Sequence, residues 1–469
     1  MATLGIDLGT GSVKCALVSE DGLVLAQASR SYQVSSVKSG WAESDPAQWI
    51  RATREVVERV LIESNVTPTT VGFSGQMHGV VIADSELKPL RPAILWADSR
   101  ASDEAKQMSM DLGINLLSRL GSPAVPGFSA TTLAWLKLNE PGLFVDAKHV
   151  LQPKDWLRAA LGGQIASDPS DASGTLLFDS SAGDWSKKAV QWSGVEPELL
   201  PPVRASQASA GYVDFNGTKY PCVVGGADTA CVLSSLGLEP GQGFIAVGSG
   251  SQVVRVLEGP DFDSTLRTHT FATVGQPRSG WYRIGAIQNA GLSLTAALRW
   301  FNASIEEGVA ALSEGLRDED PLYIPYLSGE RTPFMNSHLR GSWHDLTLST
   351  DRPAMLRSIF VGVAQAVALG VSAVGETGAS LPKPTPLVGG GTHNPVFRQL
   401  LADATGVPLA VMEAPDAAVI GAALLGAGLT SNPIPQSWSE VVTPDPLAAE
   451  SLLHLRQSML KIMKEEEYL

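Results

Sequence analysis

Leu8-Gly9-Thr10-Gly11-Ser12-Val13, near the start of the chain, is echoed about half a chain length later by Val247-Gly248-Ser249-Gly250-Ser251-Gln252. Apolar, β-prone runs flank both segments, so each is expected to form a strand, a turn of glycine and hydroxyl residues, and a second strand. A fold built from two related halves explains this spacing, with residues 236–243 as a natural boundary. Two unrelated glycine-rich hairpins explain the short match about equally well.

Hairpins of this composition are suited to binding phosphate. Glycine tolerates unusual backbone dihedrals and lets a phosphate approach closely, so successive N–H groups can point at one anion. Thr10 and Ser249 add hydroxyl donors, and Lys14 adds a cation. Asp7 ends the first strand just before the turn, which suits water-mediated contact with Mg²⁺ on the phosphates. Neither hairpin matches the Walker P-loop or the G-x-G-x-x-G pattern, so neither of those folds is expected.

Composition limits the classes of partner. The chain has 469 residues, enough for two or three domains, and its 44% apolar and 17% charged residues are typical of a globular protein. The net charge of −14 leaves no broad basic face for nucleic acid. We expect no membrane partner, because no uninterrupted apolar run approaches the ~20 residues of a membrane helix. Three sparse cysteines and the lack of a secretory signal favour a cytoplasmic location.

Asp228 is a candidate catalytic carboxylate. The apolar run Val223-Val224-Gly225-Gly226-Ala227 delivers it onto small residues that should begin a helix. Phosphoryl transfer needs positioning, charge neutralisation and one carboxylate to receive the alcohol proton. An aspartate at such a position is also commonly no more than a helix N-cap, so both roles are open.

A third glycine cluster, Gly389-Gly390-Gly391-Thr392-His393-Asn394, precedes a helix start at Pro395. A strand, three glycines and a helix can lay the ring or ribose of a nucleotide against backbone. Taken alone, a plain tight turn is the simpler interpretation.

Together these segments resemble the FGGY carbohydrate kinases and, within them, the xylulokinase branch. The resemblance spans about residues 5–428. It rests on Gly5-Ile6-Asp7-Leu8-Gly9-Thr10 with Lys14, on Gly75-Gln76-Met77-His78-Gly79, and on the segments at 91–98, 151–157 and 325–333. Several motifs in the right order are far more specific than any one of them.

The resemblance implies an α/β fold of two actin-like (ribonuclease H-like) domains, with ATP and sugar bound in the cleft between them. Residues 1–238 would form the N-terminal domain and residues 239–469 the C-terminal domain. It also allows the last helix to pack back on the first domain. The expected partners are ATP and a small sugar. The sequence is compatible with a homodimer and identifies no interface.

The resemblance also assigns roles to individual residues. Asp228 would be the general base, and Asp7 would organise Mg²⁺ and the phosphates. The ketose pocket would include Met77, His78, Trp96 and Thr229, although a structural loop histidine is the alternative for His78. The nucleotide would be held by Gly9, Thr10, Lys14, Ser249, Gly390, Gly391 and Asn394.

Three departures from the family pattern weaken the identification of the sugar. Thr229 stands where asparagine is usual, Thr131-Thr132 replaces a Pro-Lys pair, and residues 341–345, including His344, are bulkier and more polar than expected. The expected function is ATP-dependent phosphorylation of a ketopentose, with D-xylulose the leading candidate. The alternatives are a kinase for another ketose or polyol, such as D-ribulose, and an actin-like ATPase or sugar-binding protein without transfer activity.

Overall fold

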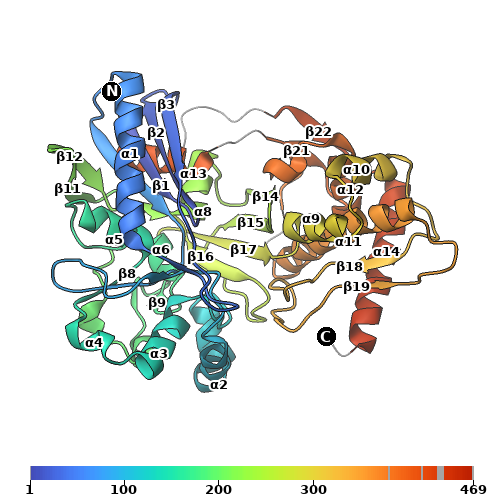
Figure 1. The fold of residues 1–469 in the computed structure, drawn as a ribbon, viewed down its shortest axis with the longest axis horizontal. Helices are drawn as coiled ribbons and strands as arrows, with labels where there is room; N and C mark the ends of the chain where they lie inside the picture. Colours follow the sequence, from blue (N-terminus) through green and yellow to red (C-terminus); the bar gives the residue numbers. More distant parts are fainter. Residues whose placement is uncertain (1, 379–380, 413–415, 430–437, 467–469) are drawn as a thin grey trace.

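The computed structural model describes residues 2–378, 381–412, 416–429 and 438–466. Within these residues the chain forms two seven-stranded mixed sheets in two domains (Figure 1). The first sheet contains β1 (Ala2–Leu8), β2 (Ser12–Ser19), β3 (Val24–Ser31), β5 (Thr70–Gly75), β11 (Ser209–Phe215), β12 (Thr218–Val223) and β13 (Gly226–Ala227). The second contains β14 (Gly243–Val247), β15 (Ser251–Leu257), β16 (His269–Ala272), β17 (Trp281–Ile287), β20 (Thr385–Val388), β21 (Leu409–Val411) and β22 (Glu440–Val442).

Six strands of each sheet are hydrogen-bonded in an equivalent order. The first sheet runs β3-β2-β1-β5-β12-β11 and the second runs β17-β15-β14-β20-β21-β22. In both, the first strand of the hairpin is antiparallel to the second and parallel to the strand on its other side. The two glycine-rich segments are the turns of equivalent hairpins. The chain therefore consists of two related halves, and the interpretation as unrelated hairpins is wrong.

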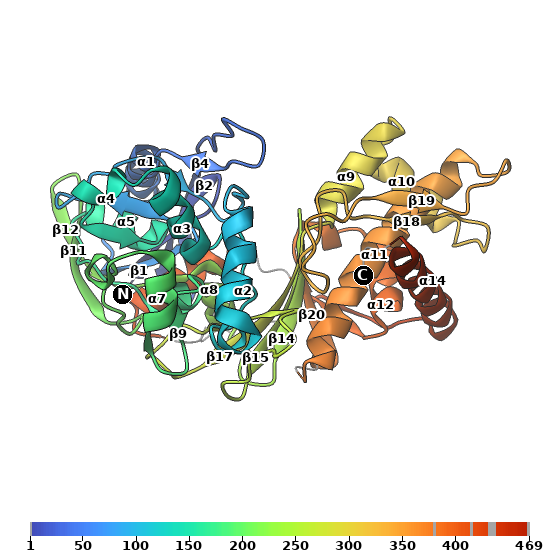
Figure 2. The same cartoon turned by 90° about the horizontal axis from the view of Figure 1, so that it is seen from below.

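Both faces of the second sheet are buried. Along β14, Ile245 and Val247 belong to the apolar core of the second domain, whereas Phe244 belongs to a cluster shared with the first domain. Figure 2 shows this sheet standing between the first domain and the helices of the second. A sheet covered on both sides explains why its strands read as continuous apolar runs.

The two domains exchange helices. Helix α13 (Ala417–Gly426) contacts β1, β2 and β5 of the first sheet, as Figure 1 shows. A Cβ on Gly5 would lie 2.1 Å from the carbonyl oxygen of Val419, and one on Gly72 would lie 1.8 Å from that of Ala422, so only glycine permits this approach. Conversely, α8 (Asp228–Ser235) brings Leu233 into the cluster that contains Phe244 of the second sheet.

The last helix does not return to the first domain. Helix α14 (Pro446–Glu465) contacts α12 (Pro395–Thr405) and β18 (Leu322–Ile324), both in the second half. The sequence expectation for the last helix is therefore wrong, and α13 takes that place because the strand glycines accommodate it. The domain boundary at residue 238 stays a prediction.

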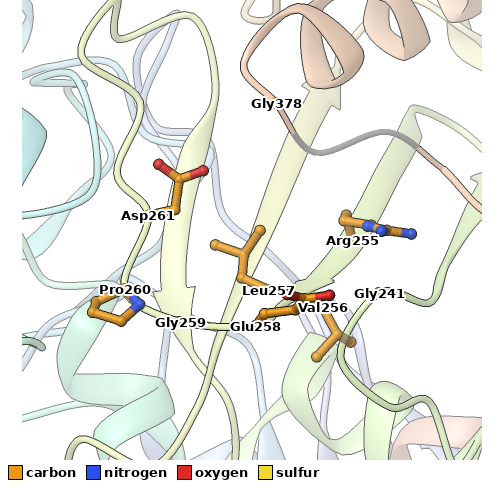
Figure 3. Close-up of a pocket in the computed structure, with 9 residues that line it drawn as sticks. All are labelled: Gly241, Arg255, Val256, Leu257, Glu258, Gly259, Pro260, Asp261 and Gly378. Carbon is orange, nitrogen blue, oxygen red and sulfur yellow. The ribbon is translucent and has the colours of Figure 1, made fainter.

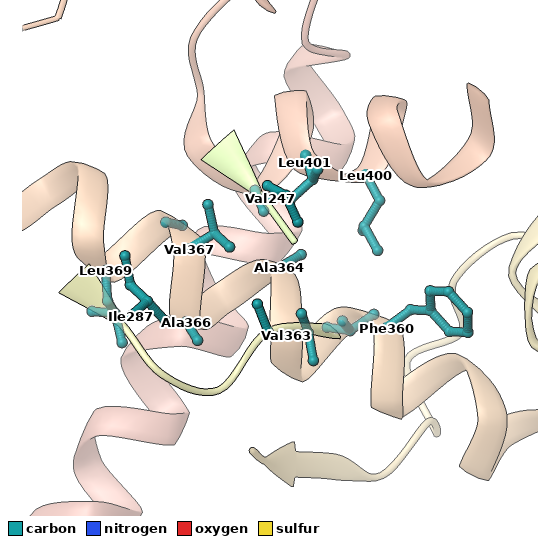
Figure 4. Close-up of a cluster of buried hydrophobic side chains, with 14 of the residues drawn as sticks. Val247, Ile287, Phe360, Val363, Ala364, Ala366, Val367, Leu369, Leu400 and Leu401 are labelled. Carbon is teal, nitrogen blue, oxygen red and sulfur yellow. The ribbon is translucent and has the colours of Figure 1, made fainter. Parts of the chain in front are cut away.

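Helix α11 (Arg352–Glu376) is the core helix of the second domain. It is the one helix of the described ranges that is long and apolar enough to cross a membrane, but 83% of its most apolar stretch is buried inside the protein. Figure 4 shows Phe360, Val363 and Val367 of this helix packed near Val247 and Leu401. Gln365, within the apolar stretch, donates to the carbonyl oxygen of Leu452 at 2.6 Å.

The remaining elements surround the two sheets. Helix α1 (Pro46–Ser64) covers the first sheet; Asp45 caps it by accepting from the N–H of Ala47. The other helices are α2 (Ser102–Arg119), α3 (Ser129–Asn139), α4 (Leu143–Asp146), α5 (Pro153–Ala160), α6 (Pro169–Ser173), α7 (Lys187–Ser193), α9 (Gly291–Trp300), α10 (Ile305–Ser313) and the 3₁₀ turns η1 (Pro197–Leu199) and η2 (Gly390–Thr392). Short antiparallel pairs are β4 (Glu43–Ser44) with β7 (Ala93–Ile94), β6 (Val81–Ala83) with β8 (His149–Leu151), β9 (Phe178–Asp179) with β10 (Asp184–Trp185), and β18 with β19 (Ser342–His344).

Candidate active site

Hydrogen bonds within the turn and from other segments fix the first glycine hairpin. The N–H of Gly9 donates to Ser12 O at 2.9 Å. The carbonyl oxygen of Gly9 accepts from the hydroxyl of Tyr32 and, at 3.2 Å, from Nε2 of Gln76. These bonds fix the turn while Gly11 stays exposed. Sequence reasoning did not assign Tyr32 or Gln76 a role, although Gln76 lies inside the quoted Gly75–Gly79 motif.

Trp96 connects the first hairpin to the second domain. Its Nε1 donates to Oγ1 of Thr10 at 2.8 Å, and the guanidinium of Arg331 lies 5.5 Å from the centre of its ring. Trp96 was expected in the ketose pocket and Thr10 at the phosphates. The structure brings these two predicted residues together.

Lys14 has a carboxylate partner within the protein. Its Nζ lies 2.6 Å from Oδ1 of Asp416, the residue that precedes α13. The side chain of Lys14 is 43% exposed, so it is accessible to a ligand. Its predicted contact with phosphate would require exchange of Asp416 for a phosphate oxygen.

Asp7 is a buried carboxylate with an unsatisfied oxygen. It pairs in register with Lys14 on β2 and Ser74 on β5, and its Oδ1 has no hydrogen-bond partner. Burial raises the pKa of Asp7, and the charge of Asp416 raises it further, against opposing effects of Ser74 and Lys14. An orphan carboxylate oxygen fits a hydrated divalent cation.

The protein offers no complete metal cage in the ranges that the structure covers, since no group of three or more His, Cys, Asp or Glu side chains converges there. The Asp7 carboxylate suits Mg²⁺, which keeps several waters and binds through one or two carboxylates together with substrate phosphates. Asp7 is the residue that would hold it.

Asp228 comes off the same edge of the first sheet as Asp7. Strand β13 pairs in parallel with β5, with Gly226 opposite Ser74, and Ser74 is in turn opposite Asp7. The Asp228 carboxylate accepts from N–H and Oγ1 of Thr229 at 2.6 and 3.2 Å, both through Oδ1. Burial, followed by the charge of Asp7, raises the pKa of Asp228 to about 7. A carboxylate with this pKa can both take and release a proton near neutral pH.

His78 is fixed in one tautomer. Its Nδ1 lies 2.5 Å from the carbonyl oxygen of Gly174, which can only accept, so Nδ1 carries the hydrogen and Nε2 presents a lone pair. Burial lowers the pKa of His78 to about 3, with a smaller contribution from the charge of Arg331, so the ring is neutral at pH 7. It stacks on Phe128 with 3.8 Å between ring centres. Beside it, Sδ of Met77 accepts from the hydroxyl of Tyr282 at 3.7 Å.

One short helix, α6, joins the base, the sugar loop and the second sheet. Oγ of Ser170 accepts from the N–H of Ala227, directly before Asp228, at 2.9 Å. The next turn ends in Gly174, the partner of His78. Oγ of Ser173 accepts from the N–H of Ala272 on β16 at 2.9 Å. No local sequence pattern indicates these partners, because each hydrogen bond joins residues far apart in the chain.

A buried ionic network supports α6. Nζ of Lys154 lies 2.7 Å from Asp155 and 3.3 Å from Asp168 and Asp171, and all four side chains are fully buried. Oδ2 of Asp168 accepts from the hydroxyl of Ser170 at 2.5 Å. Burial raises the pKa of Asp171 well above its usual range, and the nearby carboxylates add to the effect. The network thus fixes the hydroxyl that positions the backbone before Asp228.

A cavity of about 400 Å³ lies beside the second hairpin. Its polar rim includes Gly248, Gly390, Gly391 and Asn394, and its apolar walls include Leu294, Ile305, Val309, Phe360 and Phe397. Oδ1 of Asn394 accepts from the N–H groups of Val396 and Phe397 and so caps α12. The volume and lining suit a flat heterocycle with a polar tail. Three predicted nucleotide residues meet here, next to Ser249.

A second cavity, of about 430 Å³, is separate from this site (Figure 3). Its lining includes Gly241, Arg255, Leu257, Glu258 and Asp261. Gly241 and Leu257 are at the opposite end of the β14–β15 hairpin from the glycine turn. It contains no residue predicted for the active site.

Comparison with known proteins identifies the family. The model of the N-terminal domain of the FGGY family of carbohydrate kinases matches residues 2–231, and that of the C-terminal domain matches residues 263–429. The chain belongs to the FGGY family of carbohydrate kinases. It is 32% identical to the xylulose kinase of Bacillus subtilis (strain 168), over 90% of this chain and 87% of that protein. It is 31% identical to the xylulose kinase of Escherichia coli (strain K12), over 92% and 90%.

Solved structures agree with the fold of this FGGY kinase. A "xyloylose kinase" from Brucella ovis superposes with a TM-score of 0.92 at 29% identity, covering 100% of this chain and 99% of that one. Plasmodium falciparum glycerol kinase with ADP gives 0.86 at 20% identity, covering 98% and 97%, and shows the shared fold alone. The expectations of a two-domain α/β fold and of a carbohydrate kinase that resembles xylulokinases are confirmed.

Proposed function

We propose that this FGGY kinase transfers the γ-phosphoryl group of ATP to the terminal hydroxyl of a ketopentose, converting D-xylulose to D-xylulose 5-phosphate. The observation that carries the proposal is the pair Asp7 and Asp228 on one edge of the first sheet, with the pKa of Asp228 raised to about 7. The relatives named xylulose kinase support the choice of sugar.

In the proposed step Asp228 takes the proton of the sugar hydroxyl as the oxygen attacks the γ-phosphorus. The new O–P bond forms while the bond from the γ-phosphorus to the bridging oxygen breaks, and ADP leaves with that electron pair. The proton passes from Asp228 to water after product release. Asp7 would hold Mg²⁺, which would neutralise charge on the phosphates when bound.

The sugar would lie between His78 and Asp228. The lone pair on Nε2 of His78 accepts a sugar hydroxyl, and the stacked Phe128 keeps the ring from rotating. The N–H groups of the first hairpin face the phosphates. The adenine ring would occupy the apolar cavity beside Ile305 and Phe360, with its ribose near Asn394.

A related substrate is the second candidate, because of Thr229. Its hydroxyl donates to Asp228 at 3.2 Å. Threonine has no side-chain amide, which asparagine would offer to a sugar. Another ketose or a polyol that makes no such contact would lose little by this change. An ATPase or binding protein without transfer would need no base of this kind.

Coupled assay of ADP release over pentuloses, hexuloses, glycerol and pentitols tests the substrate. We expect the highest kcat/KM for D-xylulose. A preference of about tenfold or more for ribulose or a polyol overturns the choice of sugar and leaves the kinase intact. Absence of sugar-stimulated ADP release with every compound would contradict the proposed transfer.

We also propose a cytoplasmic location. All three cysteines, Cys15, Cys222 and Cys231, are buried and free, which suits a reducing compartment.

A further inference from the structure

The backbone on both sides of Arg331 is firmly anchored. The carboxylate of Glu330 accepts from the N–H of Gln288 at 2.7 Å and from Nδ2 of Asn289 at 3.0 Å. It also accepts from the N–H of Arg331 itself at 2.7 Å. Thr332 bonds twice to Ala286 of β17, donating its N–H at 2.9 Å and accepting at Oγ1 at 3.0 Å. The second sheet therefore fixes the backbone from which the Arg331 side chain extends.

The guanidinium of Arg331, by contrast, has no hydrogen-bond or ion-pair partner among the residues with described positions. Buried arginines elsewhere are paired. Arg158 lies 3.0 Å from Asp155, Arg357 lies 2.6 Å from Asp320, and Arg283 donates to the carbonyl oxygen of Thr377 at 2.5 Å. Burial lowers the pKa of Arg331, against an opposing effect of the Glu330 carboxylate.

The location of the cation indicates what would pair with it. Arg331 lies over the ring of Trp96, and Trp96 donates to Thr10 on the phosphate hairpin. Its charge also lowers the pKa of His78, so it is close to the sugar loop. It is thus near both the sugar histidine and the phosphate hairpin, and it belongs to a loop of the opposite domain. An anion that forms between these two elements would meet a planar, charged fork of donors.

We propose that Arg331 is a further catalytic residue, which binds the oxygens of the phosphoryl group as it passes from ATP to the sugar and then holds the phosphate of the product. This rests on the proposed function. Asp228 and His78 come from the first domain and Arg331 from the second, so the phosphoryl group would lie between residues of both domains. The partner is a phosphate, either the γ-phosphate of the nucleotide or that of the sugar phosphate.

Two substitutions and one control test this assignment. Arg331→Met removes the charge and keeps much of the side-chain length, and Arg331→Lys keeps the charge without the fork. Arg255→Met makes the same change on β15, at the second cavity, which is shown in Figure 3. We expect Arg331→Met to lower kcat by ~10²–10³, as for loss of one preorganised donor to a transition-state anion. We expect Arg331→Lys to restore ~10-fold of this, ketose KM to change by less than ~3-fold, and Arg255→Met to behave as wild type.

Binding measurements separate this inference from the proposed function. Calorimetry should give the dissociation constants of ADP, of a non-hydrolysable ATP analogue, of D-xylulose and of D-xylulose 5-phosphate. In Arg331→Met, we expect the gain in affinity from the γ-phosphate, from the sugar phosphate, or from both to fall by ~10-fold or more. The arm that falls identifies the phosphate that Arg331 holds. Thermal melting checks that each variant is folded.

The outcomes are distinct. A folded Arg331→Met with kcat within about twofold of wild type and with unchanged phosphate contributions overturns the inference, and Arg331 then only packs on Trp96. If the wild-type protein phosphorylates no ketose, the proposed function fails. The comparison of ADP with the ATP analogue still decides the role of Arg331: a smaller γ-phosphate contribution in Arg331→Met supports it, and an unchanged one refutes it.

Discussion

The two halves share one topology and differ in chemistry at equivalent positions. In the first hairpin, Asp7 faces Lys14 on one neighbouring strand and Ser74 on the other. At the equivalent place in the second hairpin, Ala246 faces Gln252 and Val388. The loop after β5 carries Met77 and His78, whereas the loop after β20 carries three glycines.

This difference shows how a duplicated fold divides one reaction. The first half supplies the carboxylates and the sugar loop, where the proposed proton transfer takes place. The second half supplies an apolar cavity and glycine backbone, which suit a ligand that is only held. Substitutions in the first half should therefore affect phosphoryl transfer, and substitutions in the second half should affect nucleotide binding.

The largest effect is expected at the proposed base of the first half. Asp228→Asn keeps the shape of the side chain but cannot take a proton, so kcat should fall by ~10²–10⁴ while the affinity for ATP is nearly unchanged. Coupled ADP release and calorimetry measure the two quantities. A variant that keeps more than about a tenth of wild-type kcat shows that Asp228 only serves the start of α8.

Asp7→Ala gives the first hairpin the residue that the second one has. The loss of the carboxylate should lower kcat by ~10² or more, through weaker organisation of Mg²⁺ and phosphate. The wild-type acid limb of kcat/KM should lie near pH 7, because Asp228 must be deprotonated. The charge of Asp7 raises the pKa of Asp228, so this limb should move to lower pH in the variant.

The same variant should change the dependence of stability on pH. Burial raises the pKa of Asp7 in the folded protein above its unfolded value, so ionisation of this group costs stability as pH rises through the folded pKa. Relative to wild type, Asp7→Ala should therefore gain more in melting temperature at pH 8 than at a pH close to the ordinary aspartate pKa of 3.8. Asp21→Ala, at an exposed turn of the same sheet, is the control. Equal shifts at both pH values would contradict a buried, ionised Asp7.

The smallest effect is expected in the apolar half. Ile305 lines the nucleotide cavity and is 50% exposed, so Ile305→Ala should cost little stability. Loss of part of the apolar wall should raise KM for ATP by about five- to tenfold and leave ketose KM unchanged. Leu447→Ala, exposed on α14 outside the cavity, is the matched control. An effect on ketose KM as large as that on ATP KM would place the sugar, not the nucleotide, in this cavity.

Local patterns predicted much of the fold. The strand-turn-strand hairpins depend on neighbours in sequence, and these elements form as expected. The cavity residues Gly390, Gly391 and Asn394 were also found from a local pattern. Their place beside Ser249 was implied by the resemblance to the FGGY kinases, and their role in nucleotide binding stays a prediction.

Partners distant in sequence were not predictable in this way. Lys14 and Asp416 are 402 positions apart, and nothing in either segment marks the other. No local pattern distinguishes Ser170 from the other serines, and only the folded chain places it beside Ala227. The choice of α13 over α14 to cover the first sheet is decided by space above Gly5 and Gly72, which only the packed structure reveals.

The helix exchange has a consequence for the order in which the protein acquires its structure during synthesis. Strand β1 is translated long before α13, which covers one face of its sheet. At ~5–20 residues per second, the roughly 400 intervening residues take about 20–80 s to emerge. Until α13 emerges, the surface around Gly5 and Gly72 has no native cover. The first sheet therefore stays incomplete until α13 has been translated.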